Sequence, residues 1–334
     1  MALCVAMLAC LAGFLFTSPV LIATNKLQQR AKARALIQKA LDISDFRAPG
    51  SPPFELRGTI TIPLKDGKSA PGSYLLDWVS PERWREEIHV ANYSRIRVGG
   101  AGKYWQLRSI PYELMAFDTF TKGINSAGHL RSALLEPYWN SNSKTKIMLK
   151  RRKLEGVSAD CLTLGDDTNH FCFDTQSGRL LRNGSEEWEM TKYSEYQTFA
   201  GKFVPGELDM SALDHPMGSF RLQSIAKLSD PDENLFIPPQ GAEPWPTCDV
   251  PVLPELVREK HPDAPSGESG GTVLIYGVLG ADGIYHNLKI LEATSPVFGE
   301  SVLKSWQSAV YKPQTCHGVP QKTEGIGMAK FERH

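Results

Sequence analysis

A serine between glycines is the first residue of this chain whose type and spacing suggest chemistry. Residues 267–271 are Gly-Glu-Ser-Gly-Gly, which fits the Gly-x-Ser-x-Gly pattern of hydrolase nucleophiles. In those enzymes a strand precedes the serine and a helix follows it. Here a proline-rich segment precedes Ser269 and a strand pattern follows it. His129, in Ser-Ala-Gly-His-Leu, has a local sequence like that of a protease catalytic histidine, but it lies in a helical pattern far upstream. We therefore expect Ser269 to be a loop serine, and we predict no catalytic residue.

Acidic residues and histidines form no other convincing constellation. The chain contains no His-Glu-x-x-His, no glycine-rich phosphate loop and no Cys-x-x-Cys, and its eight histidines are scattered. The carboxylate pairs at 86–87 and 186–187 are adjacent residues on strand-like segments, so their side chains point to opposite faces. An enzyme is the least supported class, and no cofactor or metal is predicted.

Four cysteines beyond the start of the chain form two plausible pairs. Cys161 and Cys172 bracket a hairpin signal, and Cys248 and Cys316 flank the last part of the chain. The alternative is a metal site, through Cys161, His170 and Cys172 or through Cys316 and His317. Neither set has the Cys-x-x-Cys spacing of strong zinc sites, so we expect disulfides, which form in exported proteins.

Charge and the first residues bear on compartment and partners. Lys and Arg number 37 together, as do Asp and Glu, so the basic footprint of a nucleic-acid binder is missing. Residues 2–23 carry no charge, which makes 1–23 either a signal peptide or an N-terminal membrane anchor. Basic residues follow this run rather than precede it, which fits a signal imperfectly. A cytosolic chain with a buried N-terminal helix remains the alternative.

Hydrophobic periodicity divides the rest of the chain into two domains. Residues 24–41 predict a helix, and from Phe54 the period changes to two, with Phe54, Leu56, Ile60 and Ile62 on one face. Short strand patterns continue to 228 and are interrupted by a helix from Ser126. The 24–228 domain is therefore expected to be one large antiparallel sheet with inserted helices.

A proline-rich linker at 229–247 precedes the last domain, 248–334. There the patterns predict two strands joined by a tight turn, a helix from Phe298 and a closing strand, which is a ββαβ order. The whole chain is thus expected to belong to the α+β class.

The last domain resembles the C-terminal domain of the TonB family over about 248–332. The matching phrases are Gly271-x-Val273, Asp282-Gly283, Tyr311-Lys312-Pro313 and Gly318-Val319-Pro320. The chain departs from the family at Ala309, where a tryptophan is usual, and at His261-Pro262, where Tyr-Pro is usual.

The TonB resemblance implies a periplasmic domain that binds a peptide of an outer-membrane transporter, or of another envelope protein, as an added strand. The last strand is the expected edge, and the alternative is that it is already paired or covered. The candidate partner-binding residues are Gly325, Ile326, Gly327, Met328, Ala329, Lys330 and Phe331.

The first domain is similar, more weakly, to lipoprotein-sorting carriers of the LolA type. The similarity rests on "LRGTITI" and on the phrase Tyr-x-x-x-Trp…Pro-x-Arg-Trp-Arg between 74 and 85. It implies an unclosed β-barrel-like sheet around an apolar cavity for a lipid or an acylated lipoprotein. The cavity candidates are Tyr74, Trp78, Trp84, Trp105 and Phe117, and the alternative is that these rings fill an ordinary core.

These expectations define two functions. The main one is a non-enzymatic periplasmic cell-envelope protein that is exported, or anchored in the inner membrane by residues 2–23. Its TonB-like domain would bind an envelope partner by strand addition in support of transmembrane transport. The alternative is a periplasmic lipid or lipoprotein carrier with a LolA-like cavity.

Overall fold

The structure is a computed structural model of the chain. It describes residues 19–64, 67–100, 102–135, 139, 145–165, 169–184, 189–212, 215–248, 251–262 and 270–331. Ser269 and all but the last residues of the expected signal or anchor segment lie outside this range. In the part of the chain that is described, no helix is both long and apolar enough to cross a membrane.

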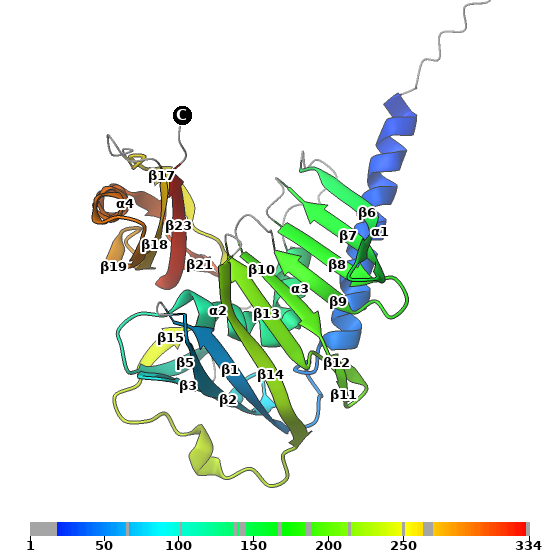
Figure 1. Cartoon of the computed structure of the whole chain (residues 1–334), viewed down its shortest axis with the longest axis horizontal. Helices are drawn as coiled ribbons and strands as arrows, with labels where there is room; N and C mark the ends of the chain where they lie inside the picture. Colours follow the sequence, from blue (N-terminus) through cyan, green and yellow to red (C-terminus); the bar gives the residue numbers. More distant parts are fainter. Residues whose placement is uncertain are drawn as a thin grey trace, which may run out of the picture.

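The largest element of the fold is one antiparallel sheet of 13 strands (Figure 1). Its strands are β1 (Phe54–Pro63), β2 (Ser69–Ser80), β3 (Arg83–Val90), β4 (Tyr93–Gly100), β5 (Lys103–Arg108), β6 (Ile147–Leu154), β7 (Val157–Leu164), β8 (Asn169–Asp174), β9 (Leu180–Gly184), β10 (Glu189–Ser194), β13 (Glu207–Ala212), β14 (His215–Lys227) and β15 (Glu243–Pro246). They lie in the order β15-β5-β4-β3-β2-β1-β14-β13-β10-β9-β8-β7-β6. The outermost strands, β15 and β6, are not paired with each other, so the expected unclosed antiparallel sheet is confirmed. The short strands β11 (Gln197–Phe199) and β12 (Lys202–Val204) form a separate ribbon.

Strand alternation decides which face of the sheet is buried. In β1, Phe54, Leu56 and Ile60 are completely buried, whereas Thr61 is exposed, as the period of two predicted. Gly58 lies on the same inward face, where a Cβ would come within 2.2 Å of the Phe220 ring on β14. The inward face is therefore packed against its neighbours at β1.

Three helices pack on this face: α1 (Pro19–Ser44), α2 (Met115–Ile124) and α3 (Ser126–Leu135). Helices α1 and α3 agree with the sequence patterns, but α2 was not predicted. Its sequence includes threonines and Gly123, which have low helix propensity. Burial of Phe117 and Phe120 against the sheet stabilises it instead.

The proline-rich segment is extended but is not a free arm. After a short 3₁₀ helix, η2 (Glu233–Phe236), strand β15 pairs antiparallel with β5 and places Trp245 opposite Tyr104. Pro244 and Pro246 lack an N–H group, which an outermost strand tolerates because its outer side has no partner strand. The segment thus extends the sheet of the first domain.

The last part of the chain is a small α+β unit. Its elements are β16 (Pro251–Val252), β17 (Glu255–Arg258), β18 (Gly271–Leu279), β19 (Tyr285–Ala293), α4 (Pro296–Ser308), β20 (Val310–Lys312), β21 (Thr315–Cys316), β22 (Val319–Pro320) and β23 (Thr323–Phe331). Strand β18 lies between β19 and β23, and α4 packs on one face of this sheet through Phe298 and Val302. Strands β18 and β19, helix α4 and strand β23 follow one another along the chain, with the short strands β20 to β22 between α4 and β23, so the TonB-like ββαβ domain stays a prediction.

Both predicted disulfides are confirmed. Cys161 and Cys172 face each other across β7 and β8, with their Cα atoms 4.0 Å apart. Cys248 and Cys316 join the end of the proline-rich segment to β21, with a Cα separation of 5.7 Å. Since these thiols are bonded to each other, they do not act as metal ligands with His170 or His317.

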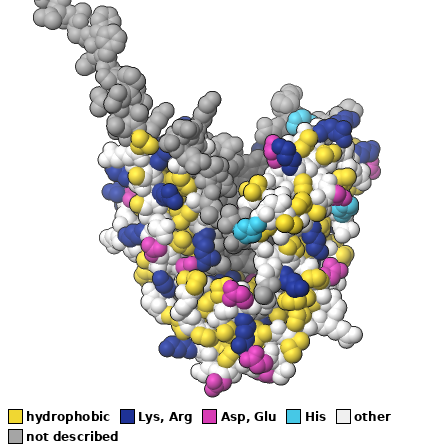
Figure 2. Space-filling view, turned by 180° about the vertical axis from the view of Figure 1, so that it is seen from behind, with side chains coloured by type: hydrophobic (Ala, Val, Ile, Leu, Met, Phe, Trp, Pro, Cys, Tyr) yellow, Lys and Arg dark blue, Asp and Glu magenta, His cyan; other side chains and the backbone are white. Residues whose placement is uncertain are grey.

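The surface carries charges of both signs. On the face shown in Figure 2, Lys and Arg side chains are interspersed with Asp, Glu and hydrophobic side chains. This agrees with the balanced composition of the chain.

Candidate functional site

The candidate site begins with three residues on the inward face of β4. Because successive strand residues alternate, Tyr93, Arg95 and Arg97 point to the same side as the buried residues of β1. The Arg95 side chain is 0% exposed and that of Arg97 is 15% exposed. A buried guanidinium is costly unless it is paired, so its partners define the site.

Arg95 binds two carboxylates from different segments. Its Nη2 donates to Oε1 of Glu86 on β3, and its Nη1 donates to Oε2 of Glu113 in the loop before α2, both at 2.7 Å. Both glutamate side chains are almost fully buried. The arginine therefore connects the sheet to the entry of α2.

Two tyrosines complete this buried network. The Tyr74 hydroxyl donates to Glu86 at 3.0 Å, and the Tyr93 hydroxyl donates to Glu113 at 2.6 Å. Burial, followed by the nearby carboxylates, raises the pKa of both tyrosines well above the usual range, so both hydroxyls keep their protons. Burial alone would raise the pKa of Glu86, but the positive charges of Arg95, Arg97 and Arg47, together with the Tyr74 hydrogen bond, outweigh it, and the pKa lies below its usual value of 4.5.

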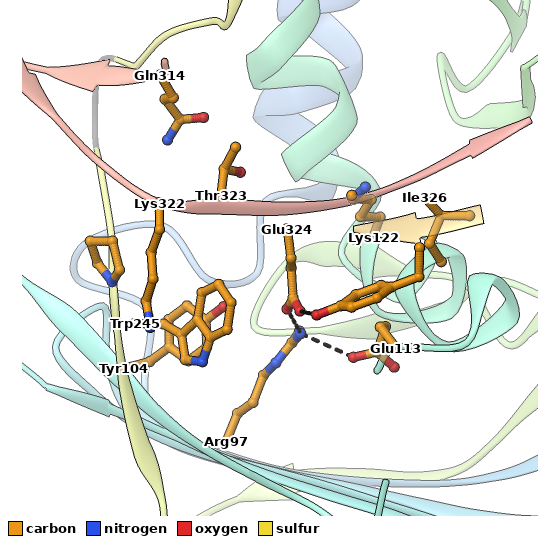
Figure 3. A pocket seen from close by; sticks show the side chains of 13 residues that line it. Arg97, Tyr104, Glu113, Lys122, Trp245, Gln314, Lys322, Thr323, Glu324 and Ile326 are labelled. Atoms are coloured by element: carbon orange, nitrogen blue, oxygen red, sulfur yellow. Dashed lines mark hydrogen bonds and ion pairs between the residues drawn. The ribbon is translucent and has the colours of Figure 1, made fainter. Parts of the chain in front are cut away.

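The C-terminal unit reaches this network through one glutamate of β23 (Figure 3). Glu324 accepts hydrogen bonds from Arg108 Nη1 at 2.9 Å and from the Tyr276 hydroxyl at 2.8 Å. Arg97 lies between two carboxylates, with its Nη2 3.2 Å from Glu113 and 3.5 Å from Glu324. The charges of the two domains are thus paired across their junction.

A cavity of about 430 Å³ opens at this junction. It is lined by Arg97, Tyr104, Glu113, Lys122, Trp245, Pro246, Tyr276, Gln314, Lys322, Thr323, Glu324, Gly325 and Ile326. On one side the Lys322 ammonium lies 4.2 Å from the centre of the Trp245 ring, a cation–π contact between β15 and the residue before β23 (Figure 3). The two carboxylates in this lining, Glu113 and Glu324, accept hydrogen bonds from arginine and tyrosine side chains. This arrangement is suited to holding the C-terminal unit against the first domain.

The expected aromatic cavity residues lie in three different places. Tyr74 and Trp78 are buried in the core on the inward face, and Trp84 is partly buried beside it. Phe117 on α2 stacks on Tyr93, with ring centres 4.5 Å apart. Trp105 alternates with Tyr104 and so points to the outward face. None of the five lines the junction cavity, and their role in lipid binding stays a prediction.

The expected partner-binding residues all lie in β23, an outer strand of the small sheet. Gly327 faces α4, where a Cβ would come within 2.1 Å of the Trp306 ring. Phe331 packs against Phe298 on the same side. Gly325 and Ile326 line the junction cavity, so the beginning of the strand faces the first domain. Partner binding by this strand stays a prediction.

The charged network was missed in the sequence. Glu86 and its neighbour Glu87 do point to opposite faces, but Glu86 meets Glu113 at Arg95 instead. The available signal was that Arg95 and Arg97 share the strand face of Tyr93, because charged residues in an inward register require buried partners. Among the described residues, no group of three or more His, Cys, Asp or Glu is placed to hold a metal ion.

Comparison with known proteins gives partial structural matches only. No protein-family model matches the chain and no curated protein matches it, so the expected TonB relationship of 248–334 has no support from sequence. A domain described as an outer membrane lipoprotein-sorting protein domain, from Vibrio parahaemolyticus, matches with a TM-score of 0.40 and 10% identity, over 62% of this chain and 97% of that one. A LolA superfamily protein from Nitrosomonas europaea matches with a TM-score of 0.38 and 13% identity, over 61% of this chain and 97% of that one. A DUF1329 family protein from Desulfovibrio piger matches with a TM-score of 0.38 and 8% identity, over 64% and 97%.

Proposed function

We propose that this chain is a non-enzymatic, exported carrier that binds the acyl chain of a lipid or lipoprotein between the inward face of its sheet and helices α2 and α3. The observation that carries the proposal is a two-helix cover over the aromatic and aliphatic face of an unclosed sheet, in which α2 is weakly stabilised by its own sequence. The two disulfides support an oxidising compartment, the periplasm.

Helix α2 depends on packing for its stability. Its N-cap residue is Leu114, which makes no side-chain capping hydrogen bond, and Gly123 lies in its last turn. Both features weaken an isolated helix. The helix can therefore leave the sheet at a lower cost than a well-capped helix of the same length.

The contacts beneath α2 can be replaced by an acyl chain. Phe117 stacks on Tyr93, Phe120 packs against Gly218, and Ile124 is buried in the same core. These contacts are apolar and largely non-directional. An acyl chain that took their place would regain about 0.8 kcal/mol for each buried CH₂ group.

A covalent lock on α2 tests the proposal. A Cβ at Gly123 would lie 3.6 Å from Cγ2 of Thr191 on β10, within reach of an engineered disulfide. It would also lie 2.7 Å from Cδ2 of Leu208, so the end of that side chain has to shift, equally in both Gly123→Cys variants. We would compare Gly123→Cys/Thr191→Cys with Gly123→Cys alone, using a fluorescent diacylated lipopeptide as the probe. The oxidised double variant should bind at least about tenfold more weakly, because the binding-competent state is then rarely populated. Wild-type protein treated with the reductant that opens the engineered disulfide controls for effects on the two native disulfides.

Two outcomes would contradict the carrier proposal. One is a wild-type protein that binds no lipopeptide and that native mass spectrometry of an envelope preparation shows without lipid-sized excess mass. The other is equal binding by the locked and unlocked variants, which would place the acyl chain elsewhere.

Partner binding at β23 is the second candidate, and its position at the edge of the small sheet favours it. A photocrosslinking residue at Lys330, which is exposed, should couple to an outer-membrane transporter in cells. The same residue at exposed Glu300 on α4 should not. Equal crosslinking at the two positions would remove this candidate.

A further inference from the structure

We propose that the C-terminal unit is a latch on helix α2, and that it acts through the loop 109–114 which precedes the helix. This inference rests on the proposed function at one point, which is that α2 covers the binding site. It adds that the docking of the C-terminal unit regulates the opening of α2.

The loop is held from both sides by two adjacent residues. Tyr112 contacts the C-terminal unit, with its ring 6.3 Å from that of Tyr276 and the Lys289 ammonium 5.8 Å from its centre. Glu113 turns to the first domain, where Arg95 and Tyr93 donate to it. The segment that enters α2 is therefore clamped between the two domains.

Two arginines connect the clamp to β23. Arg97 reaches both Glu113 and Glu324, and Arg108 lies 2.9 Å from Glu324 and 3.9 Å from Glu113. These side chains are at most 15% exposed. Without the Glu324 carboxylate, two partly buried guanidinium groups would share Glu113 as their nearest remaining carboxylate, so the position of the loop depends on Glu324.

The same network continues into α2 itself. Tyr93, which holds Glu113, stacks on Phe117 in the first turns of the helix. Lys122, in the last turn, lines the junction cavity together with Glu324 (Figure 3). Both ends of α2 thus lie next to groups whose arrangement changes when the C-terminal unit moves away.

The latch couples the docking of the C-terminal unit to the opening of α2. A partner that drew the C-terminal unit away from Arg97 and Arg108 would release the loop and lower the cost of opening α2. By thermodynamic reciprocity, a ligand bound beneath α2 would weaken the docking of the C-terminal unit by the same factor.

Hydrogen–deuterium exchange of the full chain, without any lipid, tests the latch. Glu324→Gln should speed amide exchange in 109–124 about tenfold, the effect of losing one charge-assisted contact. Glu292→Gln is the matched control, because Glu292 is exposed on β19 of the same sheet, and it should leave that segment unchanged. Tyr112→Ala removes the other half of the clamp and should have the same effect as Glu324→Gln.

The latch is overturned if Glu324→Gln changes exchange only within 271–331, or changes nothing. If Glu324→Gln lost its cooperative thermal unfolding, Tyr112→Ala would decide on the same criterion. Because no lipid is present, this result is independent of lipopeptide binding: a carrier can lack the latch, and a latch can exist without acyl binding.

Discussion

Replacing Arg95 with methionine tests how strongly the buried network stabilises the fold. Methionine has a similar length but no charge, so Arg95→Met leaves Glu86 and Glu113 without their 2.7 Å partner. Glu86 keeps the hydrogen bond from the Tyr74 hydroxyl. Glu113 keeps the hydrogen bonds from the Tyr93 hydroxyl and the Arg97 guanidinium. Loss of one partner of a buried ion pair costs ~3–5 kcal/mol. Because both glutamates keep other hydrogen-bond donors, we expect Arg95→Met to lower the free energy of unfolding by about 3 kcal/mol, the lower end of this range.

Urea denaturation followed by circular dichroism and tryptophan fluorescence measures this loss. The matched control is Arg151→Met, because Arg151 pairs with Asp160 at 2.9 Å but its side chain is 70% exposed. An exposed pair contributes little, so the control should keep the wild-type midpoint. Equal midpoints for the two variants would refute the energetic role of the network.

The pH dependence provides a second check. The pKa of Glu86 lies below 4.5 because Arg95 and its neighbours outweigh the effect of burial. Its contribution to stability is therefore present above pH 4.5 and is lost as the pH falls through the lowered pKa. Arg95→Met removes the main cause of this shift, so the stability gap between wild type and variant should narrow on acidification below about pH 5. A gap that stays constant down to pH 3 would contradict this assignment.

Two further predictions concern the disulfides and the last strand. Cys248→Ser/Cys316→Ser opens a cross-link over 68 residues and should cost about 4 kcal/mol, against about 3 kcal/mol for Cys161→Ser/Cys172→Ser over 11 residues. Thermal unfolding compares the two double variants, and the opposite order would show that loop closure is not the main effect. Gly327→Val should destabilise the C-terminal unit by ~1–3 kcal/mol, because Trp306 occupies the space for its side chain and is itself stacked on Tyr285. At Gly325 an added Cβ meets no atom within 4 Å, so Gly325→Val should be tolerated. Equal melting temperatures of the two variants would argue against the packing of Trp306 on β23.

Local patterns in the sequence were sufficient for much of the sheet. The alternation of Phe54, Leu56 and Ile60 predicted the buried face of β1, because a strand places every second side chain on the same side. The spacing of Cys161 and Cys172 around a turn predicted their disulfide, since hairpin register is set by the turn between the strands. Helix α4 was predicted for the same reason: Phe298 and Val302 repeat at helical spacing.

Non-local pairing decided what local patterns did not show. Strand β15 joins β5 although about 140 residues separate them, and prolines in its sequence favoured a linker. Helix α2 has weak intrinsic propensity and forms where Phe117 and Phe120 find an aromatic surface on the sheet.

The sequence by itself determined the α+β class, the face of β1 that is buried, and both cysteine pairs, because period and spacing are properties of neighbouring residues. Only the tertiary structure brought Arg95, Glu113 and Glu324 together, from a strand, a loop and the last strand of the chain. Glu113 and Glu324 look like ordinary surface charges in their own segments. They form a buried junction only after folding, when Glu113 pairs with Arg95 and Arg97, and Glu324 pairs with Arg97 and Arg108.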